Sequence, residues 1–147
     1  MLDLDLTKYH KHLRLSEKDG KKYIYDPIRK KSYLLQPEEF VRQIWIAYLH
    51  EELGIAHATL GVEKTINSNG VKRRYDLVHY KRGIPYVLFE FKSHTQNIDD
   101  STALQAAHYN QVLQVPFIVL SNGPKTYAFK IDFENNKVVE IAEFPLS

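Results

Sequence analysis

Two apolar runs separated by a short polar break constrain the fold of this chain more than any other feature. They lie within residues 73–93, RRYDLVHYKRGIPYVLFEFKS, and are rich in aliphatic, aromatic and β-branched side chains. Such runs on either side of the turn-like segment KRGIP predict the two strands of a β-hairpin. Each predicted strand nevertheless contains charges, Asp76 in the first and Glu90 and Lys92 in the second.

The charged positions are predicted to meet across the hairpin. Antiparallel pairing about a turn at Gly83 gives three predicted pairs: Tyr80 with Tyr86, Val78 with Leu88, and Asp76 with Glu90. Directly opposed carboxylates repel unless a cation lies between them. Lys92 is one candidate for that cation. A divalent metal ion is a better one, because hard ions such as Mg²⁺ bind carboxylate oxygens.

A simpler interpretation is that these charges form the solvated face of an antiparallel sheet, which is the more common arrangement. The opposite face of the second strand is strongly apolar, with Val87, Phe89 and Phe91. Apolar residues also occur on the charged face of both strands, since side chains alternate between the faces. Both faces are therefore predicted to be covered, with the charges clustered at one end.

Length and composition predict one compact domain over residues 1–147, with 1–35 as an N-terminal extension or hairpin ahead of the core. The chain has 147 residues, of which 44% are hydrophobic and 12% aromatic, enough for a single core. The absence of cysteine excludes disulfides and thiolate metal sites and fits a reducing cytoplasm. No secretory signal or membrane-spanning run is apparent, so a soluble cytoplasmic protein without a membrane partner is expected.

The remaining segments follow recognisable helix and strand patterns. Residues 1–21 are expected to begin as a strand or a frayed arm. Pro37 and Gly54 mark the start and stop of a helix, and Ser101 or Thr102 is the expected cap of a second. The expected order is a strand pair at 22–35, a helix at 37–53, strands at 58–67, 72–80 and 86–92, a helix at 101–114, a strand at 115–123 and a hairpin at 125–144. This order predicts a mixed α/β sandwich in which the strand after the second helix runs parallel to its neighbour.

The chain resembles the PD-(D/E)xK nuclease superfamily, whose signature is an Asp followed, on the neighbouring strand, by Glu-x-Lys. Asp76, Glu90 and Lys92 match that signature. QAAHY, from Gln105 to Tyr109, matches the Gln-x-x-x-Tyr element of one branch. PEEFVRQ before the signature and LSNGPKTYAFKIDFENN after it are similar to the N-terminal domain of type I restriction R subunits, in a free-standing single-domain form. The resemblance covers roughly residues 23–145 and implies a restriction-endonuclease-like α/β (α+β) core, a mixed central sheet flanked by helices.

The resemblance also implies a metal-dependent DNA endonuclease site. Asp76 and Glu90 would hold Mg²⁺ or Mn²⁺, with the Phe91 carbonyl as a further ligand. Lys92 would orient or activate water, or stabilise charge developing on the scissile phosphate. Gln105 would position Lys92 or the water.

The first helix supplies a further acid in this family. Glu38 is the preferred candidate because its spacing from Val41 points it toward the buried side, and Glu39 and Glu63 are the alternatives. Simple N-terminal helix charge explains Glu38 and Glu39 equally well.

Two segments, 21–31 and 72–82, interleave Lys and Arg with Tyr. This pattern suits phosphate contacts with stacking side chains nearby, although solvated strand faces explain each segment equally well. Arg73, Arg74 and Tyr109 are the predicted DNA-binding residues.

Two functions of different classes follow. The chain is either a metal-dependent endonuclease, acting alone or with a separate motor or specificity subunit, or a non-catalytic DNA-binding or adaptor module that needs a partner. The sequence contains no Walker A loop, so the ATP-driven translocation of complete type I enzymes does not carry over to it.

Overall fold

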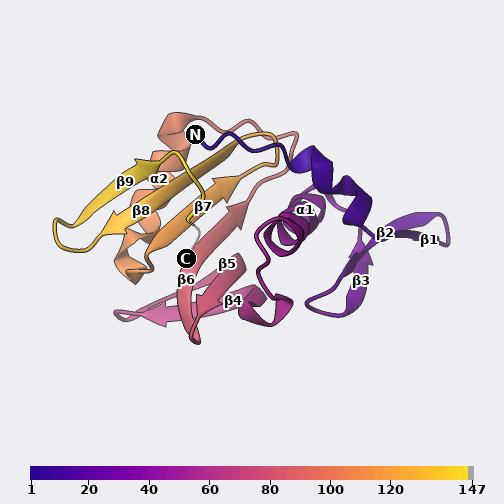
Figure 1. The fold of residues 1–147 in the computed structure, drawn as a ribbon, viewed down its shortest axis with the longest axis horizontal. Helices are drawn as coiled ribbons and strands as arrows, with labels where there is room; N and C mark the ends of the chain where they lie inside the picture. The colour runs from indigo at the N-terminus through magenta and orange to yellow at the C-terminus, as the bar shows by residue number, and fades with distance from the viewer. Residues whose placement is uncertain (146–147) are drawn as a thin grey trace.

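The computed structural model describes residues 1–145, which form a six-stranded mixed sheet and a smaller three-stranded antiparallel sheet (Figure 1). The larger sheet has the order β4-β5-β6-β7-β8-β9, and the smaller one the order β1-β2-β3. The strands are β1 (Leu15–Lys18), β2 (Lys21–Asp26), β3 (Lys31–Leu34), β4 (Leu60–Ser68), β5 (Val71–Lys81), β6 (Ile84–Phe91), β7 (Phe117–Ser121), β8 (Thr126–Asp132) and β9 (Lys137–Ile141). The helices are α1 (Pro37–Glu51) and α2 (Asp100–Asn110), with 3-10 helices η1 (Leu6–His12), η2 (His57–Thr59) and η3 (Gln111–Leu113).

The predicted strand pair before the first helix is confirmed as β2 and β3. Its turn is built on Asp26, whose buried carboxylate accepts hydrogen bonds from the backbone N–H groups of Ile28 and Arg29. The Arg29 guanidinium lies 2.6 Å from the same carboxylate. Asp26 thus satisfies the donors of the turn that Pro27 begins.

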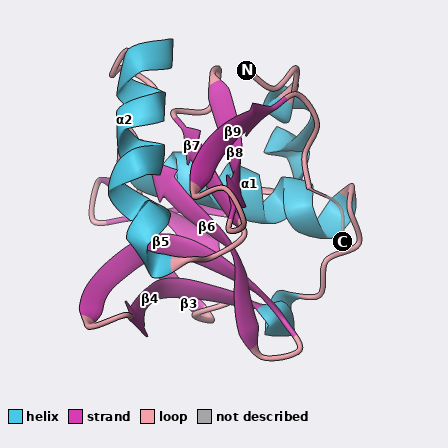
Figure 2. Ribbon diagram, turned by 90° about the vertical axis from the view of Figure 1, so that its left-hand side faces the viewer, coloured by secondary structure: helices cyan, strands magenta, loops and turns pink. Residues whose placement is uncertain are grey.

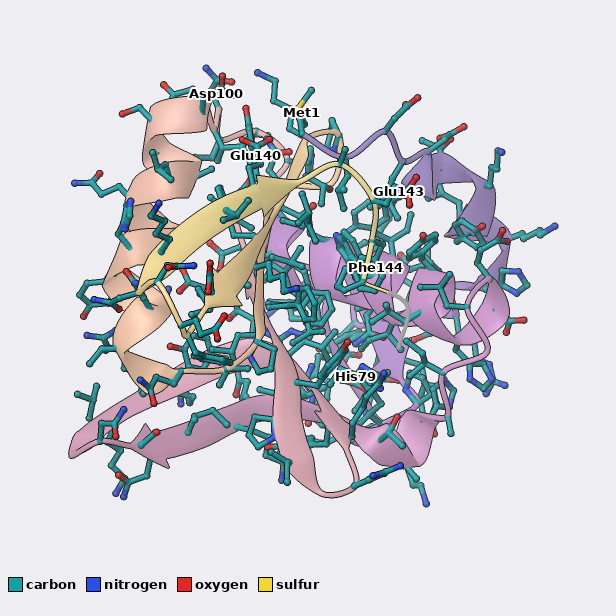
Figure 3. All side chains as sticks on the ribbon, turned by 60° about the vertical axis from the view of Figure 1, so that its left-hand side comes forward. Met1, His79, Asp100, Glu140, Glu143 and Phe144 are labelled. Carbon is teal, nitrogen blue, oxygen red and sulfur yellow. The ribbon has the colours of Figure 1, made fainter. Side chains whose placement is uncertain are left out.

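The expectation that residues 1–21 begin as a strand or a frayed arm is wrong, because the first regular element is η1 and strand β1 follows it. Leu2 and Leu6 are buried in the main core. The backbone N–H of Leu2 bonds to the carbonyl of Thr126, and the N-terminal amine pairs with Glu140 on β9 (Figure 3). These contacts fix the start of the chain against the C-terminal hairpin.

Helix α1 begins and ends as its sequence predicts. Pro37 is in the first turn, where a missing N–H costs little, and Gly54 follows the end with a φ of 68°. Trp45 is fully buried at the centre of its apolar stripe.

The central hairpin β5–β6 has a turn at Arg82 and Gly83, both with positive φ. Two such residues match the twist of the flanking strands. The predicted pair Val78 with Leu88 is confirmed. The predicted pair Tyr80 with Tyr86 is wrong, because a register shift after His79 places Tyr80 opposite Pro85.

The crossover through α2 confirms the predicted parallel pair, since β6 and β7 are the only parallel neighbours among the described strands. The cap of α2 is Asp99, not Ser101 or Thr102. Its Oδ1 accepts from the backbone N–H of Thr102 at 2.8 Å. The α-helical part is shorter than expected because it tightens into η3 at Gln111.

The two α-helices cover opposite faces of the large sheet (Figure 2). On one face, Trp45 of α1 packs with Phe89 and Phe91 of β6 and with Phe144 near the C-terminus. On the other face, Ala103 and Ala107 of α2 pack against β7 and β8. The predicted α/β (α+β) class, a mixed sheet flanked by helices, is therefore confirmed. No helix within residues 1–145 is both long and apolar enough to cross a membrane.

Candidate active site

The candidate site lies where β5 and β6 separate. Backbone pairing of the two strands ends at Leu77 with Phe89, and Asp76 and Glu90 occupy the next position of the same register. Asp76 Oδ2 accepts a 2.7 Å hydrogen bond from the backbone N–H of Phe91. The carboxylate thus takes the place of a backbone carbonyl of β5 as the acceptor for β6. Beyond this point β6 pairs with β7 and no longer with β5.

Glu90 is held from the side of α2. Its Oε1 accepts a 2.7 Å hydrogen bond from Nδ2 of Asn110, the last residue of that helix. The buried Tyr75 hydroxyl donates to Oδ1 of Asn110 at 2.6 Å. Burial, followed by the nearby charge of Glu90, raises the pKa of Tyr75 to about 12.

Asn110 was not among the predicted site residues, although its sequence position carries a signal. It lies three residues after Ala107 and seven after Ala103, so it continues the buried stripe of α2. A polar residue on such a stripe needs buried partners. The sequence could not show that one of these partners is Glu90.

The oxygen atoms of this pair suit a hard divalent ion. Hydrogen bonds account for one oxygen of each carboxylate, and within residues 1–145 neither Asp76 Oδ1 nor Glu90 Oε2 accepts one. Over the same residues, no three His, Asp or Glu side chains form a closed cluster for a metal ion. Two carboxylates are a donor set of the kind that holds Mg²⁺ or Mn²⁺, because Mg²⁺ is usually bound by one or two carboxylates and keeps several waters.

Lys92 follows the end of β6 and is half-buried. Its backbone N–H donates to the Ser121 carbonyl at 2.9 Å, which extends the parallel pairing with β7. Its ammonium makes no ion pair with an acid in the described part of the chain. Lys92 is therefore not a structural counter-charge of Asp76 or Glu90 in this structure.

The expectation that Glu38 points toward the buried side is wrong. Glu38 is exposed, and Glu39 occupies the buried position one residue later. Helix geometry explains the difference, because the buried stripe of α1 extends back from Gln43 through Glu39.

Glu39 and Glu63 are joined through Arg42. The Arg42 guanidinium lies 3.7 Å from Glu39 Oε1 and 3.6 Å from Glu63 Oε1. Arg42 is buried, and its Nε and Nη1 have no hydrogen-bond partner among the described residues. Glu63 lies opposite Asp76, between the pairs on either side of it in the β4–β5 ladder. Of the three candidate acids, Glu63 is thus next to the site along the sheet, and Arg42 lies 3.6 Å from its carboxylate.

On α2, Gln105 and Tyr109 are both exposed, and no hydrogen bond joins Gln105 to Lys92 in the described residues. Tyr109 contacts the sheet through Arg73, whose guanidinium carbon lies 3.7 Å from the centre of its ring. Arg73 also donates to the Tyr109 carbonyl. Arg73 therefore ties α2 to β5, whereas the neighbouring Arg74 is exposed.

The mixed sheet flanked by helices is compatible with a nuclease-like α+β core. The family model described as type I restriction enzyme R protein N terminus (HSDR_N) matches residues 37–145. The chain belongs to this family. A search of curated proteins found no match.

Proposed function

We propose that this chain is a metal-dependent deoxyribonuclease that hydrolyses phosphodiester bonds with Mg²⁺ or Mn²⁺. The observation that carries the proposal is the position of Asp76 and Glu90 one step beyond the last β5–β6 pair, Leu77 with Phe89, with Lys92 two residues beyond Glu90. Each carboxylate is fixed through one oxygen and leaves the other available for a ligand.

The proposed roles follow from the chemistry of these groups. A bound divalent ion supplies Lewis acidity toward the scissile phosphate and lowers the pKa of a bound water. Asp76 and Glu90 would hold the ion through the oxygens that their hydrogen bonds leave available, with the Phe91 carbonyl as a further ligand. Lys92 would orient the attacking water or stabilise charge on the phosphate, which the absence of an ion pair at Lys92 within residues 1–145 permits. Glu63, beside Asp76, is the acid placed best to complete the site.

DNA is the proposed substrate and partner, and a separate motor or specificity subunit is a further proposed partner. The family supports both, since R proteins belong to multi-subunit restriction enzymes that act on DNA. Exposed Lys64, Lys72 and Arg74 on the β4–β5 hairpin provide positive charge next to the candidate site. These side chains suit contacts with the DNA backbone.

The Asp76→Ala substitution tests the site directly. Calorimetry with Mg²⁺ and Mn²⁺ is expected to show binding by the wild type and its loss in the variant. Cleavage of supercoiled, linear and single-stranded DNA is expected to disappear in parallel. Asp3→Ala, which removes an exposed acid from the N-terminal segment, is the matched control and should keep both.

Two outcomes would count against the proposal. Equal metal binding by the wild type and Asp76→Ala would remove the ion from this position. A wild type that binds DNA but does not cleave it with either metal would favour the non-catalytic module.

A further inference from the structure

We infer that Asn110 is a positioning residue that sets the orientation of the Glu90 carboxylate for metal binding. The inference rests on the proposed metal-dependent function. It concerns a residue outside the Asp, Glu-x-Lys and Gln-x-x-x-Tyr elements, and it follows from the hydrogen bonds of one buried amide.

Asn110 has three hydrogen-bond partners from three elements. Its Nδ2 donates to Glu90 Oε1 at 2.7 Å and to the Ala106 carbonyl at 2.9 Å. Its Oδ1 accepts from the Tyr75 hydroxyl at 2.6 Å. Asn110 itself is 1% exposed, so no solvent competes for these groups.

These partners leave the amide only one orientation. The Ala106 carbonyl can only accept a hydrogen bond, so the nitrogen must face it. The oxygen then faces Tyr75, which must donate, and the second N–H is directed at Glu90. A rotated amide would place two acceptors, its own oxygen and the carbonyl of Ala106, against each other.

The consequence falls on Glu90. Its Oε1 accepts a hydrogen bond from an amide of fixed orientation, which restrains the carboxylate. Within residues 1–145, Oε2 is left as the oxygen without a hydrogen bond. Partners that orient a ligating carboxylate in this way are usually needed for full metal affinity. Asp76 receives the equivalent support from a backbone N–H, so side-chain substitution can test only the Glu90 half.

Asn110 could instead serve only to join α2 to β5. That alternative predicts that its loss loosens the packing around Tyr75 and disturbs Asp76 and Glu90 alike. Positioning predicts a change confined to Glu90. The Asp76 carboxylate is therefore the internal reference against which a change at Glu90 is measured.

The test uses Asn110→Leu, which keeps a side chain of similar shape but has no donor, and Tyr75→Phe, which removes only the hydroxyl that fixes the amide. The carboxyl carbon signals of Asp76 and Glu90 are measured by NMR in the metal-free protein, and Mn²⁺ affinity by calorimetry. We expect Asn110→Leu to move the Glu90 signal, to leave the Asp76 signal in place, and to weaken Mn²⁺ binding by roughly ten- to a hundred-fold. Tyr75→Phe should act in the same direction and less strongly.

Gln111→Leu is the matched control, because its amide reaches Asn136 and not the site. An unchanged Glu90 signal in Asn110→Leu, or equal movement of the Asp76 and Glu90 signals, would overturn the inference. If the wild type binds no Mn²⁺, the proposed function fails, yet the NMR signals of the metal-free protein still decide whether Asn110 orients Glu90.

Discussion

Each of the two carboxylates at the candidate site, Asp76 and Glu90, accepts a hydrogen bond from another residue of the protein in the absence of any ligand. Phe91 N–H holds Asp76, and Asn110 holds Glu90. Fixing each group in advance lowers the entropy lost on binding and keeps two like charges at a set separation. Lys92 lies two residues after Glu90 and makes no ion pair within the described residues, so its positive charge is available for a ligand.

Lys92→Ala is expected to reduce the rate of DNA cleavage by roughly 10²-fold or more while leaving metal affinity nearly unchanged. The reason is that Lys92 acts on the water or the phosphate and not on the ion. Single-turnover cleavage and calorimetry measure the two quantities separately. Lys92→Arg keeps the charge but not its shape, so a rate close to wild type in that variant would show that charge alone suffices. Normal cleavage by Lys92→Ala would contradict a catalytic role.

Some of these residues could be predicted from the sequence and others could not. The opposed positions of Asp76 and Glu90 could, because the pair Val78 with Leu88 follows from the position of the turn. The contacts of Asn110 and Arg42 could not, because they depend on how α2 and α1 lie on the sheet. Spacing from Val41 predicts that Glu38 points toward the buried side, whereas the helix buries the neighbouring stripe with Glu39.

Among the elements, β5 departs most from a regular strand. Strict alternation would place Tyr75 and Val78 on opposite faces, but both pack in the same buried cluster with Leu88. The departure coincides with Glu63 on the paired strand, which has a φ of 52° and interrupts the β4–β5 ladder opposite Asp76. A left-handed residue of this type typically costs of order 1–3 kcal/mol and clusters at functional sites. The irregularity changes which face of the sheet the side chains next to the candidate site occupy, as bulges commonly do.

His79 lies on β5 directly before the register shift in its pairing with β6 (Figure 3). We expect this residue to make folding stability depend on pH. Its side chain is buried, and Nδ1 has no hydrogen-bond partner among the described residues. Burial, with a smaller effect from Lys81, lowers the pKa of His79 below its ordinary value of 6.5. The folded chain therefore keeps this imidazole neutral at pH values where the unfolded chain protonates it. The unfolding free energy should fall as pH drops below 6.5, until the folded pKa is reached.

The measurement is urea unfolding of the wild type and His79→Phe at several values between about pH 5 and 7. The wild type should lose up to about 1.4 kcal/mol per pH unit from this group, and the variant should show a flatter dependence. His57→Phe should remove a separate part of the slope, because burial and the adjacent His50 lower the pKa of His57 as well. Parallel curves for the wild type and His79→Phe would rule out the assignment to His79.

Most elements could be predicted from the sequence, since α1, the hairpins β4–β5 and β5–β6 and the crossover through α2 have strong local signals. The predictions that failed concern segments whose structure depends on contacts with distant parts of the chain. The N-terminal residues 1–12 carry no clear strand or helix pattern, and their order comes from burial of Leu2 and Leu6 against the core. Asp99 caps α2 from just before the predicted start, where several Asp and Ser residues compete for the same role.

Across the whole molecule, a chain of charged side chains connects the small sheet to the candidate site. Arg29, from the β2–β3 turn, bonds to Asp26 and lies 2.7 Å from Glu39 on α1. Arg42 continues the series to Glu63, beside Asp76. The ion pairs thereby extend from the residues before the family match at 37 to β4, the strand that pairs with β5 and its candidate ligand Asp76.

The positive charge of the molecule is distributed so that DNA contacts can be tested one residue at a time. Arg74 and Lys72 are exposed on the same side of β5, opposite Thr65 and Asn67 of β4. Arg73 was predicted to contact DNA as well, but its guanidinium is stacked on Tyr109. Replacing Arg73 would therefore change both charge and the packing of α2, which makes Arg74 the cleaner probe.

We predict that Arg74→Ala weakens binding to all duplex sequences alike, because contacts with phosphates carry no base information. Each phosphate contact contributes about −0.9 to the slope of log affinity against log salt concentration, so losing one should flatten the slope by about one unit. The measurement is a titration of one labelled duplex at several salt concentrations, with Ca²⁺ in place of Mg²⁺ to suppress cleavage. Lys130→Ala is the matched control, since Lys130 is exposed on β8, beyond β6 and β7 from the hairpin. An unchanged slope in Arg74→Ala would remove Arg74 from the DNA path. Absence of DNA binding by the wild type at low salt would instead favour an adaptor surface built for protein.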